Sequence, residues 1–367
     1  MDHPENSKEY VGLQVNQGVA QPSIINPYLK RSRFQRRELS VAEMVEGIVK
    51  GDVTVLSQAV TLVESVNPDH QQKAQEVIDK CLPYSGKSIR IGISGVPGAG
   101  KSTSIDEFGV HVLDRTGGKL AVLAIDPSSE RSKGSILGDK TRMEKLSIHP
   151  KAFIRPSPSA GSLGGVARKT RESIVLCEAA GFNNIFVETV GVGQSETAVH
   201  SMVDFFLLIQ LAGTGDELQG IKRGIMEMAD GIVINKADGD NIERANLAKA
   251  QFQSALHLFP PTLSGWIPEV LTYSGYYGIG IKEVWEMIDR YFEFVKGNGY
   301  FEHRRMEQEK YWMYETIDEQ LKAHFYRDPE VEALLKVKQD NVLAARQSSF
   351  VAAKDVLDYY FQKMGLK

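Results

Sequence analysis

Short apolar runs alternate with longer polar stretches between residues 89 and 273. The runs are rich in Val, Ile, Leu and Phe, and each is followed by enough chain for a helix: IRIGIS, LAVLAI, AFIRP, NIFVE, DFFLLIQL, GIVIN and EVLTY. Continuous apolar strands of this kind, separated by helices, indicate a parallel sheet that is covered on both faces. The pattern therefore predicts an α/β fold, a doubly wound and mainly parallel sheet, over roughly residues 85–297.

Residues 38–84 show helical rather than strand spacing of apolar positions. Ser40 and Glu43 fit a capping box, and Leu39 with Met44 fits the hydrophobic staple around it. Further helices are expected in VTVLSQAVTLVES and after Asn67-Pro68. We interpret residues 38–84 as an N-terminal helical subdomain.

The two ends of the chain differ from this core. Residues 1–37 are polar and end in the basic run KRSRFQRR, which we interpret as a flexible tail, with an anion- or partner-binding arm as the alternative. Beyond the boundary at Gly297-Asn298-Gly299, residues 298–367 are helical and charged. Asp328-Pro329 fits the cap and first position of a helix in this C-terminal segment.

Composition excludes several classes of protein. With 367 residues, of which 42% are hydrophobic and 25% charged, the chain is long enough for one large domain with additions. A net charge of -4 gives no general attraction to nucleic acid or membranes, so neither is expected as a partner. Cys81 and Cys177 form no CxxC or metal-binding pattern. Without a leader or an apolar run of ~20 residues, a cytoplasmic location is predicted.

GVPGAGKST follows the first predicted strand and opens a helix. In this context it is a P-loop, whose glycines let backbone N–H groups surround phosphates at the positive end of a helix. The lysine is expected at the β- and γ-phosphates, and the first hydroxyl after it on Mg²⁺. The predicted nucleotide contacts are Gly95, Pro97, Gly98, Ala99, Gly100, Lys101, Ser102 and Thr103.

NKAD, residues 235–238, follows the apolar strand GIVI and predicts guanine as the base. The Asp238 carboxylate accepts from guanine N1–H and the 2-amino group together, whereas adenine lacks that amino group. Asn235 is expected to brace the loop and the base edge, with the Lys236 stem on the ring face. In TYSG, Ser274 and Gly275 occupy a loop whose backbone N–H is expected to meet guanine O6. Gly275 replaces the usual Ala, but a backbone contact tolerates that change.

Acidic residues end the strands that border the predicted nucleotide. Asp126 follows the second strand, Asp139 lies in the loop GSILGDKTRM, and Glu188 ends NIFVE. Carboxyl ends of parallel strands face the ligand crevice, so these acids and Ser102 are assigned to Mg²⁺, and the acids with Lys101 to catalysis. Glu188 is expected either to hold a metal-bound water or to position the attacking water.

Two further loops carry candidate switch residues. The Gly191 N–H is expected to sense the γ-phosphate, and Gln194 is a candidate for orienting the attacking water. The polar loop GTGDELQGIKRG follows the strand DFFLLIQL, whose end should open on the nucleotide. We therefore interpret Asp216, Gln219 and Lys222 in that loop as part of a mobile element.

These motifs, taken in order, resemble the methylmalonyl-CoA mutase-associated GTPases, or MeaB/ArgK family: GVPGAGKST, LAIDPSS, GSILGDKTRM, LGGVAR, CEAAGF, VETVGVGQSE, GDELQGIKRG and INKADGDN. The family belongs to P-loop GTPases that have Glu in place of Asp in the third motif. The resemblance runs from about residue 40 to the end. It implies a GTP-hydrolysing chaperone that binds an adenosylcobalamin-dependent acyl-CoA mutase, gates cofactor loading and protects the mutase.

The resemblance also implies roles for parts of the chain. The loop at residues 213–224 would be a third switch that answers to the mutase, and residues 298–367 would be a dimerisation arm of a homodimer. One departure is Glu130-Arg131-Ser132-Lys133, where the family has small residues, which affects the conformation expected for that switch loop.

Two other functions are open at the level of sequence. A nickel or zinc metallochaperone GTPase would normally carry Cys or His clusters for its cargo, and none is evident. A kinase linked to arginine or ornithine transport would need an acceptor-hydroxyl site and a base, and the sequence identifies neither.

Overall fold

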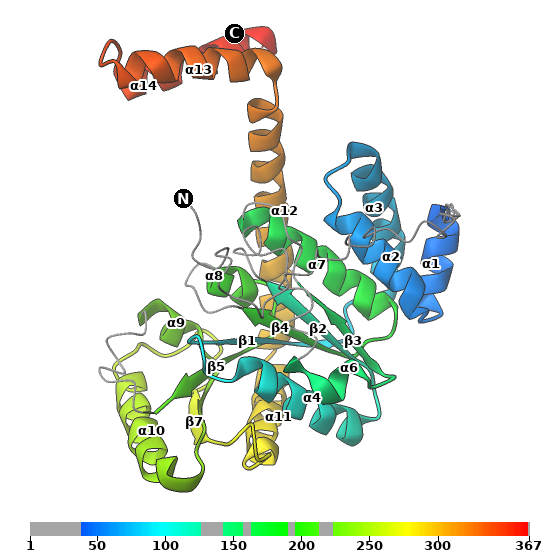
Figure 1. Cartoon of the computed structure of the whole chain (residues 1–367), viewed down its shortest axis with the longest axis vertical. Helices are drawn as coiled ribbons and strands as arrows, with labels where there is room; N and C mark the ends of the chain where they lie inside the picture. Colours follow the sequence, from blue (N-terminus) through cyan, green and yellow to red (C-terminus); the bar gives the residue numbers. More distant parts are fainter. Residues whose placement is uncertain (1–37, 126–141, 157–162, 190–194, 213–222, 366–367) are drawn as a thin grey trace, which may run out of the picture. The chain divides into compact units, whose positions relative to one another are not determined.

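The computed structural model describes residues 38–125, 142–156, 163–189, 195–212 and 223–365. At its centre, seven strands form one sheet in the order β3-β2-β4-β1-β5-β6-β7, and every neighbouring pair is parallel (Figure 1). The prediction of a doubly wound parallel α/β fold is therefore confirmed. The strands are β1 Ile89–Gly95, β2 Leu120–Ile125, β3 Ala152–Arg155, β4 Asn184–Thr189, β5 Phe205–Leu211, β6 Gly231–Asn235 and β7 Glu269–Thr272.

The strand order reverses around β1, which lies between β4 and β5. In such a sheet, the crevice at the carboxyl ends of the strands beside the reversal binds the ligand. Parallel pairing aligns Ile93 with Glu188 across β1 and β4, and Gly95 with Ile209 across β1 and β5. The end of β1 and the acid of β4 are thus brought to the same edge.

Helices cover both faces of the sheet. On one face, α4 Lys101–Thr116 and α11 Ile281–Gly297 pack against each other, with the short α6 Glu144–Ser147 beside α4. On the other face lie α7 Leu163–Ala179 and α8 Ser195–His200, where a Cβ at Gly92 would come within 2.8 Å of Val199. Helix α9, Arg223–Met228, lies beside α8, and α10, Ile242–Leu256, packs on β6 and β7.

Three helices precede the sheet: α1 Val41–Val49, α2 Val53–Glu64 and α3 Pro68–Cys81, followed by the 3₁₀ turn η2 Leu82–Tyr84. The Glu43 N–H donates to Ser40 Oγ at 3.3 Å, and the Ser40 N–H donates to the Glu43 carboxylate at 2.8 Å. This confirms the predicted capping box. These helices pack on α7, where the Lys169 ammonium donates to the Glu64 carbonyl at 2.8 Å.

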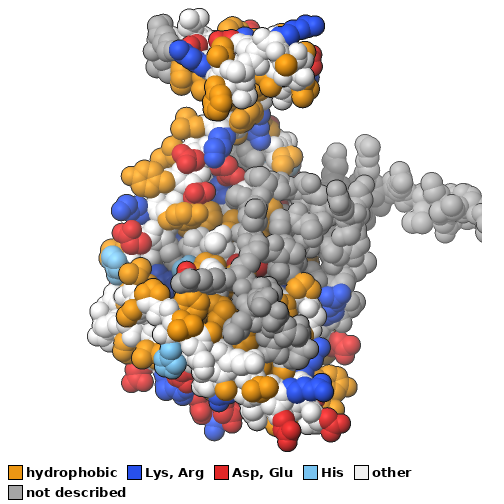
Figure 2. Space-filling model, turned by 90° about the vertical axis from the view of Figure 1, so that its left-hand side faces the viewer, with side chains coloured by type: hydrophobic (Ala, Val, Ile, Leu, Met, Phe, Trp, Pro, Cys, Tyr) orange, Lys and Arg blue, Asp and Glu red, His pale blue; other side chains and the backbone are white. Residues whose placement is uncertain are grey.

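The chain ends in α12 Tyr300–Tyr326, α13 Pro329–Leu343 and α14 Ser349–Lys363. The Asp328 carboxylate accepts from the Glu330 and Val331 N–H groups, which confirms it as the cap of α13. Helices α13 and α14 pack on each other, and hydrophobic side chains lie on their surface, at the top of Figure 2. Residues 40–367 form one compact unit, so the boundaries at 84/85 and 297/298 stay predictions.

Helix α12 crosses the amino ends of the strands, opposite the P-loop edge. Arg305 forms two hydrogen bonds with the Asp204 carboxylate, at 2.8 and 2.7 Å, just before β5. Arg304 pairs with Asp230, just before β6, at 3.3 Å. Removing one partner of a buried ion pair destabilises the protein, because the other charge is left buried without a partner. These pairs therefore hold α12 against the sheet. Among the helices of the described ranges, none is long and apolar enough to cross a membrane.

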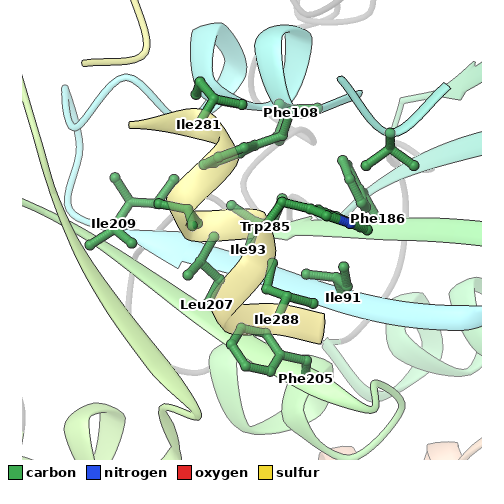
Figure 3. Packing of buried hydrophobic residues seen from close by; sticks show 14 of the residues in the cluster. Ile91, Ile93, Phe108, Phe186, Phe205, Leu207, Ile209, Ile281, Trp285 and Ile288 are labelled. Atoms are coloured by element: carbon green, nitrogen blue, oxygen red, sulfur yellow. The ribbon is translucent and has the colours of Figure 1, made fainter. Parts of the chain in front are cut away.

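The main core lies between the sheet and the α4–α11 layer, as Figure 3 shows. Phe108 of α4, Trp285 of α11, Ile93 of β1 and Phe186 of β4 belong to this one buried cluster. Each of these side chains is at most 2% exposed, and full burial of such a side chain contributes about 1.5–3 kcal/mol. This layer holds α4, and with it the P-loop, in a fixed position.

Candidate nucleotide site

The P-loop joins β1 to α4. Gly98 and Gly100 have φ values of +80° and +85°, a left-handed conformation that favours glycine. Gly95 has a different constraint, because a Cβ there would lie 2.2 Å from the Ile209 carbonyl oxygen of β5. The glycines of the motif are therefore needed for the path of the backbone and for its close approach to β5. Pro97 and Thr103 are exposed.

Lys101 begins α4, and its ammonium donates to two carbonyls of the loop, Gly95 at 2.9 Å and Val96 at 3.4 Å. Burial lowers the pKa of Lys101, while the charges of Glu188 and Glu196 act in the opposite direction. The lysine is thus a half-buried cation between the loop and two carboxylates. That is the position from which it is predicted to reach phosphates.

Ser102 and Glu188 meet at the carboxyl edge of the sheet. The Ser102 hydroxyl donates to Glu188 Oε1 at 3.3 Å, although the two residues are far apart in sequence. A hydroxyl and a carboxylate are hard oxygen donors of the kind that Mg²⁺ prefers, so this pair fits the predicted metal site. Asp126 and Asp139, the other predicted ligands, lie outside the described residues.

Asn235 connects three parts of the site. Its amide donates to the Ala99 carbonyl of the P-loop at 2.7 Å, and its oxygen accepts from the Lys236 N–H at 2.7 Å and the Gly275 N–H at 2.9 Å. The side chain is buried, so these bonds are shielded from water. These bonds join Asn235 to the P-loop and to its own loop, while its predicted contact with the base edge stays a prediction. The Gly275 amide, in the loop predicted to meet guanine O6, here bonds Asn235.

Asp238 and Ser274 face each other beside Asn235. The Ser274 hydroxyl donates to Asp238 Oδ2 at 2.5 Å, which holds the carboxylate in one orientation. Lys236 is exposed, with a φ of +60° that is rare for a residue with a side chain. The residues of NKAD and TYSG that are predicted to bind guanine therefore lie together, at the ends of β6 and β7.

Several predicted site residues lie outside the described residues, and their roles remain predictions. They are Asp126, Asp139, Gly191, Gln194, Asp216, Gln219 and Lys222, together with the unusual run at residues 130–133.

The structure adds two features that the sequence did not indicate. Glu196, in the first turn of α8, is only 1% exposed and its charge acts on Lys101. It is the last residue of VETVGVGQSE, so its place directly after GQS was an available signal. The buried Tyr273 hydroxyl lies 2.6 Å from Ser104 Oγ. Nothing in the local pattern identified this pair, because Tyr273 simply ends an apolar strand.

The described ranges offer no evident site for a metal cargo. No group of three or more His, Cys, Asp or Glu side chains there is placed to hold a metal ion. Cys81 and Cys177 are buried free thiols, and burial raises the pKa of both, that of Cys81 to about 11. A protonated buried thiol is a poor metal ligand.

Comparison with known proteins gives consistent matches. A protein-family model described as methylmalonyl Co-A mutase-associated GTPase MeaB matches residues 56–330. A probable GTPase of Mycobacterium tuberculosis is 47% identical over 308 residues, covering 84% of this chain and 91% of that protein. GTPase ArgK of Escherichia coli K12 is 44% identical over 329 residues, covering 88% and 99%.

Two further matches carry different names. The mitochondrial methylmalonic aciduria type A homolog of Mus musculus is 44% identical over 323 residues, covering 85% of this chain and 78% of that protein. The crystal structure of a protein named LAO/AO transport system kinase is 36% identical, with a TM-score of 0.69, and covers 87% of this chain and 97% of that one. The matched family region spans the whole nucleotide site described above.

Proposed function

The chain belongs to the MeaB family of methylmalonyl-CoA mutase-associated GTPases, and on that premise we propose that it is a chaperone for an adenosylcobalamin-dependent acyl-CoA mutase. In this role, GTP hydrolysis times the loading of the mutase with its cofactor and protects the loaded mutase. The observation that carries the proposal is the family match over residues 56–330, whose description names association with that mutase. The name of the mouse relative refers to methylmalonic aciduria, which shares the methylmalonyl group with that description.

Each residue of the nucleotide site has a proposed role in GTP binding or hydrolysis. In this proposal, the P-loop N–H groups and Lys101 would bind the phosphates, Asp238 and Asn235 would bind guanine, and Glu188 would serve the γ-phosphate end of the nucleotide. Ser102 and Glu188 would hold Mg²⁺, which neutralises phosphate charge when it is bound. Glu188, which accepts a hydrogen bond from Ser102, is also proposed to orient the attacking water. Slow intrinsic hydrolysis that a partner accelerates is common in such enzymes.

A physical link between α12 and the nucleotide edge supports a response to a partner. The turn that ends α8 is held by α12, because the Trp312 indole N–H donates to the Ser201 carbonyl at 3.1 Å and the Gln308 amide donates to the Val203 carbonyl at 2.7 Å. At its other end, α8 carries Glu196, whose charge acts on Lys101. A partner that displaces α12 would therefore change the surroundings of the P-loop lysine.

We also propose that the protein is a homodimer formed through its C-terminal helices. Large exposed hydrophobic side chains are frequent there, and such surfaces mark association sites. They are Met306, Tyr311, Met313, Tyr314, Ile317, Leu321, Tyr326, Val337, Leu343, Phe350, Val351, Leu357, Phe361 and Met364. Light scattering should give twice the chain mass, and Leu343→Glu with Phe350→Glu should halve it. Ile148→Glu, an exposed hydrophobic position outside this surface, is the control. A monomeric unmodified protein would contradict the proposal.

The chaperone role is tested by steady-state GTP turnover with and without the mutase of the same organism. Turnover should rise when the mutase is added, and it should not rise with an unrelated protein at equal concentration. Lack of any response to adenosylcobalamin-dependent acyl-CoA mutases would overturn the role while leaving the GTPase assignment intact.

The protein of the related crystal structure is named a kinase, so phosphate transfer is a second candidate activity. A kinase would move labelled γ-phosphate from GTP to an acceptor protein, whereas a GTPase releases it as inorganic phosphate. Counting the label in protein and in free phosphate in one reaction separates the two.

A further inference from the structure

A buried chain of hydrogen bonds joins the P-loop helix to the end of β7. The Ser104 hydroxyl of α4 donates to the Gly100 carbonyl at 2.8 Å and lies 2.6 Å from the Tyr273 hydroxyl. A serine hydroxyl has one hydrogen, so Tyr273 is the donor to Ser104. Neither side chain is more than 1% exposed. We call Tyr273, Ser104 and the Gly100 carbonyl the hydroxyl relay.

Tyr273 is fixed on every side. Its ring stacks on Phe108 of α4 with the ring centroids 5.5 Å apart. Its backbone N–H donates to the Ile234 carbonyl, and its carbonyl accepts from the Ala237 N–H, both at 3.0 Å. The residue therefore ties α4 to the NKAD loop as well as to β7.

The hydroxyl relay restricts the neighbouring position 275. A Cβ at Gly275 would lie 2.9 Å from Ser104 Oγ, while its next nearest atoms, Asn235 Oδ1 and Ser104 Cα, would be at 3.5 Å. The backbone of Gly275 is not in the left-handed region, so an alanine there is disfavoured by the Ser104 hydroxyl and not by backbone strain. This explains why glycine stands where GTPases usually have alanine.

We propose that Tyr273 and Ser104 are positioning residues for the guanine nucleotide, and that they are the reason for Gly275. A bound nucleotide has a fixed distance between its phosphates and its base. The hydroxyl relay sets the matching distance in the protein, because it connects the P-loop at Gly100 to the loops that carry Asp238 and Ser274. The proposal rests on the assignment of those loops to guanine and does not depend on the mutase chaperone role.

The experiment is a double-mutant cycle on the full chain, with fluorescent GDP as the probe. Gly275→Ala should raise the Kd for GDP about tenfold, which is about 1.4 kcal/mol, because the added methyl group overpacks a tight site. In a Ser104→Ala background, the same change should raise the Kd less than about twofold, since the atom in conflict is gone. Gly297→Ala, with open space around it, and Ser254→Ala, whose hydroxyl bonds a carbonyl one helical turn back, are the matched controls.

Tyr273→Phe keeps the stacked ring and removes only the donor, so it tests the hydroxyl relay even if Gly275→Ala fails to fold. The Kd for GDP should rise severalfold. Equal effects of Gly275→Ala in both backgrounds, or an unchanged Kd in Tyr273→Phe, would overturn the proposal. The proposal would also be overturned if the coupling between Gly275→Ala and Ser104→Ala appeared only in the Tm of the nucleotide-free protein and not in the Kd. The residues would then support the fold alone.

Discussion

Replacing Asp238 by Asn should convert the guanine site into a xanthine site. The carboxylate is half-buried and held by the Ser274 hydroxyl at 2.5 Å, with its remaining acceptor positions available to the base. Guanine offers two donors, N1–H and the 2-amino group, whereas xanthine has a carbonyl oxygen in place of that amino group. An asparagine amide that keeps its oxygen toward N1–H presents its NH₂ to the 2-position, which suits xanthine and opposes guanine.

The magnitude follows from the lost bonds. The bond to the 2-amino group is lost, and the bond to N1–H keeps only a neutral acceptor. Each hydrogen bond to a charged acceptor contributes about 1.5–3 kcal/mol, so a loss of between one and two such bonds corresponds to an increase of roughly 10–10⁴ in the Kd for GDP. The fold should be retained, because the Ser274 hydroxyl can either donate to the asparagine oxygen or accept from its nitrogen. Unchanged circular dichroism and Tm would check that point.

The assay is competition of GDP and XDP against a fluorescent guanine nucleotide, followed by turnover of GTP and XTP. Asp240→Asn is the matched control, because Asp240 is exposed and lies only two residues further along the chain. If the Asp238 variant bound GDP with unchanged affinity and still rejected XDP, the assignment of this carboxylate to the base would be refuted.

Three further predictions concern charge and stability. Lys101→Ala should abolish productive GTP binding, measured as the Kd for GTP and as turnover. The same change at the exposed Lys282 should leave both unchanged. Tight GTP binding by Lys101→Ala would contradict the role of Lys101. Arg305→Met should lower the free energy of unfolding, measured in urea, by about 3–5 kcal/mol, because Asp204 stays buried without its cation. As the control, Arg290→Met breaks the exposed pair with Glu269 and should lower it by at most about 1 kcal/mol. Burial, aided by the charge of Arg304, lowers the pKa of His200 to about 3, so its neutral form contributes stability above about pH 6.5 that is lost as the pH falls toward 3. When the pH is lowered from 7 to 5, the free energy of unfolding of His200→Leu, measured in urea, should therefore fall by about 2 kcal/mol less than that of the unmodified protein. Equal decreases in the two proteins would show that His200 titrates normally.

The order of residues along the chain was enough to predict the sheet and the local parts of the site. Buried parallel strands require continuous apolar runs, so the strands from Ile89 to Thr272 were visible without a structure. The P-loop and the caps at Ser40 and Asp328 were equally visible, because each is built from residues within a few positions of one another. Local hydrogen bonding and periodicity depend directly on neighbouring residues.

Which distant groups meet could be learned only from the folded chain. Residues 298–367 read only as helical and charged, yet Arg304 and Arg305 are paired with acids just before β6 and β5, more than 70 residues earlier in the chain. In the same way, Tyr273 reads as the end of an apolar strand, and its bond to Ser104 spans 169 residues. A buried polar group must find a partner, but the partner is chosen by packing and not by sequence spacing. Sequence therefore predicted which local motifs form the nucleotide site, while folding determined which distant residues hold the P-loop and the NKAD loop together.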